Sequence, residues 1–224
     1  MTPVQLPLNL PVRQAFGHED FLVAASNTDA VNWIDRWPDW PSHVLILFGD
    51  EGCGKTHLSH VWQDRSSAIR LNEEEFFGQP LVGREKAYIF EDVDTYLSGP
   101  GREEQLLHSY NWLKEKASFL LLTARTHPRS WGMSLPDLSS RILSCPIVEM
   151  GQADDSLLAS VIIKQFADLQ VILPSEVLDY LLPRIDRSFA GVRRTVRRID
   201  RLALTEKRAV TIPLARKALE SLED

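Results

Sequence analysis

The chain has 224 residues, 44% of them hydrophobic and 25% charged, and a formal net charge of −6 at pH 7. This length can hold one large domain or a domain with a smaller one, while the negative charge argues against broad non-specific DNA binding. The longest apolar runs fall far short of the roughly 20 residues that cross a bilayer, and two cysteines, Cys53 and Cys145, form no disulfide or metal-ligand pattern, so we expect a cytoplasmic protein that is not exported.

Residues 1–15 contain three prolines and no helical spacing, which predicts an extended arm. From His18 to Trp37 apolar residues recur near helical spacing, which predicts a helix that ends at Pro38. The apolar run from Val44 to Phe48 follows and is typical of a buried strand.

The sequence directly after this strand is Gly49-Asp50-Glu51-Gly52-Cys53-Gly54-Lys55-Thr56, which fits the phosphate-loop pattern G-x-x-x-x-G-K-[ST]. Such a loop lets consecutive backbone N–H groups converge on phosphate oxygens, and the following helix N-terminus adds partial positive charge. We expect Gly49, Gly52 and Gly54 in the turn, Lys55 at the terminal phosphates and Thr56 on Mg²⁺. The chain should bind a nucleoside diphosphate or triphosphate; an ordinary glycine-rich turn is the alternative.

Strands and helices alternate beyond this loop. The sequence predicts a short strand near 68–71, a small acidic helix, a strand at 86–90, a helix at 103–118 and a strand at 119–123. The last of these is continuously apolar, as expected for a parallel strand covered on both faces. The predicted fold is therefore α/β, with a doubly wound parallel sheet flanked by helices.

Polar residues end two of these strands: Glu91 and Asp92 follow one, and Thr123 closes the next. Open α/β sheets bind ligands at this edge. One carboxylate there can hold Mg²⁺ or its waters, and the other, Asp92, can orient an attacking water as a catalytic group. Thr123 can sense a γ-phosphate. A solvated strand end and a simple cap are the alternatives.

Residues 135–141 predict a short helix that places Arg141 near its end, at the surface. Such an arginine can pair with an exposed carboxylate. It can also act in trans as a finger that stabilises transition-state charge on a neighbour's nucleotide. From these residues alone, the ion pair is the simpler interpretation.

Beyond Gly151 the sequence predicts only helices, at about 154–169, 175–182, 189–207 and 212–222. One of them carries arginines at helical spacings, which favour a solvated basic face, a nucleotide sensor or a phosphate contact: Arg193, Arg194, Arg197, Arg198 and Arg201. The expected domains are an arm at 1–15, an α/β nucleotide-binding domain at 16–151 and a helical lid at 152–224.

The phosphate loop, the acidic pair, the polar strand end, Arg141 and a lid with Gly191-Val192-Arg193 occur in the order found in AAA+ ATPases, which the chain resembles. More narrowly, the stretches from Gly49 to Leu58, Ser26-Asn27 and 135–141 resemble the bacterial replication initiator DnaA and the Hda family of its shortened relatives. DnaA adds a C-terminal helix-turn-helix. We expect none here, which favours the Hda family.

The segment Gln5-Leu6-Pro7-Leu8-Asn9-Leu10 is similar to the peptide by which the Hda family docks on the β sliding clamp. Gln5 would hydrogen-bond a pocket rim while Leu6, Leu8 and Leu10 fill apolar subsites. The resemblance implies an ADP-bound, clamp-tethered regulator that stimulates ATP hydrolysis by DnaA and so represses re-initiation of replication. The implied partners are the clamp and DnaA. We expect neither sequence-specific DNA binding nor membrane binding, and a homo-oligomer is an open alternative.

The resemblance also implies residue roles within an AAA+ core and a helical lid. Lys55, Thr56 and His57 would lie at the phosphates of ADP or ATP, with Mg²⁺ held by Thr56 and Glu91. Arg141 would be the finger given in trans and Arg193 the lid sensor. Phe21 and Val23 would lie near the base.

Two positions depart from the family pattern. Glu91 stands where the first acidic residue is normally Asp, and Mg²⁺ tolerates little deviation from octahedral geometry. Arg125 stands where the initiator usually has an acidic sensor residue. We therefore expect weak or no intrinsic ATPase activity. The alternatives are a self-sufficient AAA+ ATPase acting as a helicase-loader-type motor, and a DNA-binding adaptor that uses the face from Arg193 to Arg201.

Overall fold

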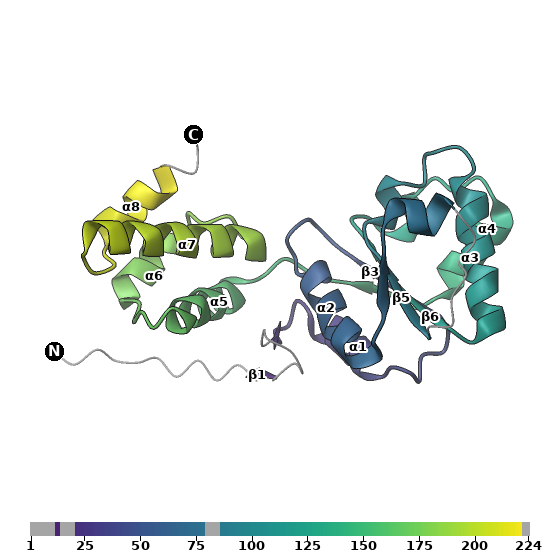
Figure 1. The fold of residues 1–224 in the computed structure, drawn as a ribbon, viewed down its shortest axis with the longest axis horizontal. Coiled ribbons are helices and arrows are strands. Elements are labelled where there is room, and N and C mark those ends of the chain that lie inside the picture. Colours follow the sequence, from purple (N-terminus) through teal and green to yellow (C-terminus); the bar gives the residue numbers. More distant parts are fainter. Residues whose placement is uncertain (1–11, 14–20, 79–85, 221–224) are drawn as a thin grey trace. The chain divides into compact units, whose positions relative to one another are not determined.

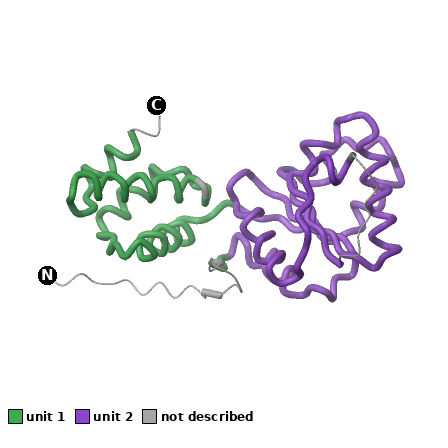
Figure 2. The backbone as a smooth tube through the Cα atoms, viewed as in Figure 1, with its two compact units in different colours: residues 1–13, 22–24, 152–224 green, residues 14–21, 25–151 purple. Residues whose placement is uncertain are grey.

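The computed structural model describes residues 12–13, 21–78 and 86–220. These residues form two compact units (Figure 2). One unit contains Phe21 and residues 25–151, and the other contains residues 12–13, 22–24 and 152–220. We call them the α/β unit and the helical unit and describe each by itself.

The α/β unit is built on a five-stranded sheet in the order β4-β5-β6-β3-β7 (Figure 1). The strands are β3 (Val44–Phe48), β4 (Ile69–Leu71), β5 (Ala87–Phe90), β6 (Phe119–Ala124) and β7 (Ile147–Glu149). All neighbouring strands are parallel, and β3 and β6 pair with Val44 opposite Leu120. This confirms the predicted parallel α/β sheet.

Helices cover both faces of this sheet (Figure 1). On one side lie α1 (Thr28–Asp35) and α2 (Lys55–Ser66), and on the other α3 (Arg102–Lys116) and α4 (Pro136–Ser144). Short turns of helix occur at Glu74–Gly78, Val93–Thr95 and Pro128–Ser130. The continuous apolar pattern of β6 follows from this double cover, because neither face of the strand meets water.

The helix predicted from His18 to Trp37 was partly wrong. Phe21–Leu22 form a short strand, β2, in a two-stranded sheet with β1 (Val12–Arg13), and α1 begins only at Thr28. Leu22 and Ala24 are buried in the core of the helical unit, so they do not extend the apolar face of α1. Asn27, which precedes α1, is of a residue type that favours a helix start.

The helical unit consists of α5 (Asp155–Asp168), α6 (Ser175–Leu181), α7 (Phe189–Glu206) and α8 (Ile212–Glu220). Asp154 accepts a hydrogen bond from the Leu157 N–H at 2.7 Å, and Ser188 accepts one from the Gly191 N–H at 2.8 Å, so side chains cap α5 and α7. Buried side chains from these helices form one core, including Leu158, Ile162, Phe166, Leu181, Val192, Ile199 and Leu214. Within residues 28–78 and 86–220, no helix combines the length and apolar character needed to span a membrane.

Candidate nucleotide-binding site

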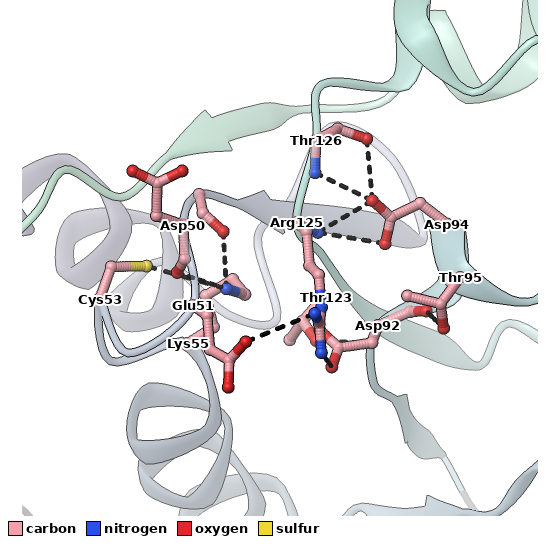
Figure 3. A network of polar contacts seen from close by, with 11 residues as sticks. Asp50, Glu51, Cys53, Lys55, Asp92, Asp94, Thr95, Thr123, Arg125 and Thr126 are labelled. Atoms are coloured by element: carbon pink, nitrogen blue, oxygen red, sulfur yellow. Dashed lines mark hydrogen bonds and ion pairs between the residues drawn. The ribbon is translucent and has the colours of Figure 1, made fainter. Parts of the chain in front are cut away.

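The phosphate loop, residues 49–56, links the end of β3 to the start of α2 (Figure 3). Gly54 has a φ of 102°, a left-handed conformation that favours glycine, and it directly precedes the first residue of α2. A side chain at Gly49 would collide with the backbone carbonyl of Met150. Glycine is therefore needed at both ends of the turn, at one for conformation and at the other for space.

Lys55 braces this loop from within. Its side chain is buried, with 6% of the residue exposed, and Nζ donates hydrogen bonds to the carbonyl oxygens of Gly49 at 2.7 Å and Asp50 at 2.9 Å. Burial raises the pKa of the Cys53 thiol and outweighs the opposing effect of Lys55, so the thiol is protonated at neutral pH. The loop thus carries one buried cation beside a neutral sulfur.

The start of α2 completes a surface that suits phosphate. The first N–H groups of a helix have no intrahelical acceptor and carry partial positive charge. Thr56 is exposed and His57 is half-buried in this first turn. Loop, helix start and Lys55 together fit the phosphate groups of a nucleotide.

Glu91, directly after β5, is held by two neighbouring side chains. Its Oε1 accepts a hydrogen bond from Ser59 Oγ at 2.8 Å and lies 2.9 Å from Arg70 Nη1. Ser59 comes from α2 and Arg70 from β4, so three elements converge on this carboxylate. The side chains of Arg70 and Glu91 are each 27% exposed. The pair is thus only partly screened by solvent.

Asp92 has a φ of 51°, and its backbone N–H donates to Thr123 Oγ1 at 3.0 Å. Thr123 is 1% exposed and so fixes the backbone of the acidic pair from the neighbouring strand. The Asp92 carboxylate lies 3.6 Å from Arg125 Nη2, and Arg125 Nη1 lies 3.4 Å from Glu51 of the loop (Figure 3). Arg125 therefore bridges the acidic pair and the phosphate loop.

Asp94 organises the loop that carries Arg125. Its carboxylate accepts hydrogen bonds from the backbone N–H of Arg125 and Thr126, at 3.0 Å and 2.9 Å, and from Thr126 Oγ1 at 2.8 Å (Figure 3). Sequence reasoning missed Asp94 and Arg70. Asp94 lies only two residues beyond the acidic pair and could have been considered with it, whereas nothing in the local sequence marks Arg70.

The predicted Mg²⁺ ligands fit the ion unequally. Thr56 is exposed at the start of α2, as a metal-binding hydroxyl would be. Glu91 does not fit in its present position, because its carboxylate already pairs with Arg70 and Ser59. In the part of the chain that the structure describes, no group of three or more His, Cys, Asp and Glu side chains forms a metal centre.

Arg141 lies in α4, and its contacts are with α3 and α4 rather than with the phosphate loop. Nε donates to Asp137 Oδ1 at 2.9 Å, Nη1 donates to Asn111 Oδ1 at 2.7 Å, and the guanidinium carbon lies 5.7 Å from the centre of the Tyr110 ring. Its side chain is 32% exposed. The pKa of Arg141 is raised, chiefly by the hydrogen bond to Asp137, so the guanidinium is firmly charged. Arg141 therefore forms the expected surface ion pair, with Asp137, and its charged guanidinium is also held in one orientation.

Glu103, in α3, holds the segment that leads into α4. Its carboxylate accepts hydrogen bonds from the Ser134 N–H at 2.9 Å, the Ser134 Oγ at 3.1 Å and the Leu135 N–H at 2.8 Å. A negative charge there also suits the N-terminal end of a helix. The helix that carries Arg141 is thereby anchored to α3 at its start.

The lid residues lie in the helical unit. Arg193 is exposed on α7, and Arg194 pairs with Asp186 at 2.9 Å. A side chain at Gly191 would collide with Asp186, so this glycine provides space for a packed carboxylate. The glycine of the Gly191-Val192-Arg193 pattern is therefore explained by packing against Asp186.

The remaining predicted residues lie near the N-terminus. Phe21 is in β2, and Val23, which follows β2, is half-buried. The sliding-clamp peptide lies outside the described residues: Gln5, Leu6, Leu8 and Leu10.

Comparisons with known proteins agree with this geometry. A family model described as "Hda, lid domain" matches residues 158–219. An uncharacterized protein of Haemophilus influenzae is 23% identical over 194 residues, which cover 81% of this chain and 83% of that protein. Domain III of the Thermotoga maritima replication initiation protein DnaA has a similar structure, with a TM-score of 0.76 at 18% identity, over 94% of this chain and 98% of the other. For AMPPCP-bound DnaA from Aquifex aeolicus the TM-score is 0.69 at 20% identity, over 80% of this chain and 63% of the other. The helical unit is thus similar to the Hda lid domain, and the likeness to DnaA domain III shows a shared fold.

Proposed function

We propose that this protein is an ADP-bound AAA+ regulator that is tethered to the β sliding clamp, stimulates ATP hydrolysis by DnaA and so represses re-initiation of replication in the cytoplasm. The observation that carries this proposal is the match of residues 158–219 to the Hda lid domain. It favours a regulator over an initiator as the functional relative.

Arg141 supports the proposal as the group offered to DnaA. It is a charged guanidinium at the surface, held in one orientation by Asn111 and Asp137. An arginine supplied in trans stabilises charge that develops on a transferring phosphoryl group. The proposed action is therefore electrostatic: Arg141 would reach the ATP of DnaA and accelerate its hydrolysis.

The acidic pair supports a regulator that turns over little ATP itself. Glu91 pairs with Arg70 and Asp92 with Arg125, so both carboxylates are engaged by guanidinium groups. A carboxylate engaged by a guanidinium has fewer free lone pairs with which to hold Mg²⁺ or to orient an attacking water. The nucleotide bound to this protein would then remain bound without being hydrolysed.

The proposal is tested by reconstitution. DnaA loaded with ATP, the clamp on DNA and this protein are mixed, and conversion of DnaA-bound ATP to ADP is followed. Arg141→Ala is expected to return the rate to that of DnaA alone, since a finger in trans contributes about a thousand-fold or more where it acts. Arg65→Ala is the matched control, because Arg65 is also an exposed arginine paired with a carboxylate, Asp35.

Two outcomes would overturn this function. Unchanged stimulation by the Arg141→Ala variant would remove the finger role. Robust ATP turnover by the chain alone, rising with its own concentration, would instead favour a self-sufficient motor.

A further inference from the structure

Glu91, which was expected to bind Mg²⁺, already has a positively charged neighbour, the guanidinium of Arg70. Two groups already contact one oxygen of this carboxylate, the Ser59 hydroxyl at 2.8 Å and Arg70 Nη1 at 2.9 Å. A hydrated Mg²⁺ needs free carboxylate lone pairs and near-octahedral space. The guanidinium therefore competes directly with a metal ion for Glu91.

Arg70 is itself held firmly in this place. Its Nη2 donates to Ser59 Oγ at 3.1 Å and to Gln63 Oε1 at 3.3 Å. Ser59 and Gln63 both belong to α2, the helix that starts in the phosphate loop. Because the guanidinium is fixed on α2 as well as on Glu91, moving it aside would break two hydrogen bonds and one ion pair at once.

The negative charge of the second carboxylate, Asp92, is also balanced by a nearby guanidinium. Arg125 lies 3.6 Å from Asp92 and 3.4 Å from Glu51, and the Asp94 carboxylate fixes the Arg125 backbone through its N–H. Arg70 and Arg125 thus place two permanent positive charges among Glu51, Glu91 and Asp92. Carboxylates with such neighbours attract a further cation less strongly than bare ones.

We propose that the guanidinium groups of Arg70 and Arg125 take over the charge compensation that a divalent cation would give, so that this site binds nucleoside diphosphates independently of Mg²⁺. The inference rests on the proposed function only for the class of ligand, a nucleotide in the phosphate loop. Arg70 determines this property because it occupies Glu91, whereas Lys55 contacts the loop carbonyls of Gly49 and Asp50 and not the acidic pair.

The test measures binding of ADP to the purified full chain, by calorimetry, with excess Mg²⁺ and with excess EDTA. The Kd is expected to agree within about three-fold between the two conditions, a difference below 1 kcal/mol. By linkage, Mn²⁺ should then bind the protein–ADP complex no more tightly than it binds free ADP, which electron paramagnetic resonance measures directly.

Arg70→Gln supplies the contrasting variant. Glu91 loses its guanidinium partner, so Mg²⁺ should now strengthen ADP binding by ten-fold or more over EDTA. Arg65→Gln is the matched control, since Arg65 lies in α2, the helix that Arg70 contacts, but pairs with Asp35, and this variant should remain insensitive to Mg²⁺. Glu91→Gln, which removes the carboxylate itself, should also bind ADP equally with and without the metal, and it provides a second reading if Arg70→Gln folds poorly.

A wild-type Kd that weakens ten-fold or more in EDTA overturns the inference. It would leave the proposed function intact, because stimulation of DnaA through Arg141 is measured separately. Absence of ADP binding in both conditions would overturn the inference and the nucleotide-bound state of the proposed regulator together. An unchanged metal response in Arg70→Gln would show that the pair with Glu91 only joins β4 to β5.

Discussion

Arg141 of α4 and Asn111 of α3 are joined by a hydrogen bond of 2.7 Å between Nη1 and Oδ1. Nε of the same guanidinium donates a hydrogen bond to Asp137 Oδ1, one helical turn away on α4. The amide orients Arg141 without opposing its charge, whereas the carboxylate orients it and also neutralises it. These two partners should therefore affect a finger in opposite directions.

Asn111→Ala is expected to lower stimulation of DnaA hydrolysis about three- to ten-fold, because Arg141 loses an orienting hydrogen bond to another helix. Asp137→Asn is expected to raise it about two-fold, since the weak exposed ion pair that competes with a phosphate for Arg141 is removed. Initial rates of ATP hydrolysis on DnaA measure both effects. Equal loss in both variants would mean that the two groups only support α4.

Glu103→Gln is expected to lower the free energy of unfolding of the α/β unit by about 1 kcal/mol at pH 7, because the hydrogen bonds to residues 134 and 135 lose a charged acceptor. Burial alone would raise the pKa of Glu103, but the bonds from Ser134 and Leu135 outweigh it, and the pKa is lowered from 4.5. A lowered pKa means stability that is present above the unfolded-state pKa and lost as pH falls through the folded-state value.

Urea unfolding of wild type and Glu103→Gln at a series of pH values tests this. The difference between them should be full above about pH 4.5 and shrink at lower pH, as Glu103 becomes protonated in the wild type. A difference that stays constant with pH would show that the carboxylate charge plays no part.

Gly191→Ala tests the packing at the start of α7. Helix propensity alone predicts a gain of about 1 kcal/mol for alanine over glycine. The added methyl would collide with Asp186, which is fixed by the Ser188 N–H and by Arg194. We expect a net loss of about 1 to 3 kcal/mol in the free energy of unfolding. Urea unfolding monitored by circular dichroism measures this loss. An increase in stability would show that Asp186 yields easily.

The sliding-clamp peptide is tested by fluorescence anisotropy. The intact chain should bind the β clamp with a Kd of about 1 µM or below, and simultaneous Gln5→Ala, Leu6→Ala and Leu8→Ala substitutions should abolish binding, because they remove the rim contact and two apolar anchors. Asn9→Ala, between the anchors, is the control and should bind as wild type. If the triple variant still binds, the clamp contact lies elsewhere.

Local signals in the sequence were enough for most of the fold. Continuous apolar runs marked β3 and β6, and helical spacing marked the helices of the lid to within a few residues. The strand β7 was not predicted, because its three residues, Ile147–Glu149, show neither a long apolar run nor a regular alternation. Its pairing with β3 is a property of the folded sheet.

The site divides in the same way. The phosphate loop is encoded in consecutive residues, so its pattern located it in the sequence. The partner of Glu91 could not be predicted from such a pattern. Arg70 comes close to Glu91 only because β4 pairs with β5, which places Arg70 beside Ile89. Similarly, the hydrogen bond from Arg141 to Asn111 depends on how α3 and α4 pack, and no residue spacing in the sequence predicts it.

The close approach of Gly49 to Met150 has a mechanical consequence. The Met150 N–H also donates to the Phe48 carbonyl at 2.8 Å, and the next N–H, of Gly151, donates to the Ser26 carbonyl at 2.9 Å. The backbone of the phosphate loop and the end of the α/β unit are therefore coupled without a side chain between them. A shift of the Gly49 backbone would therefore have to move the Met150 backbone with it, within the α/β unit itself.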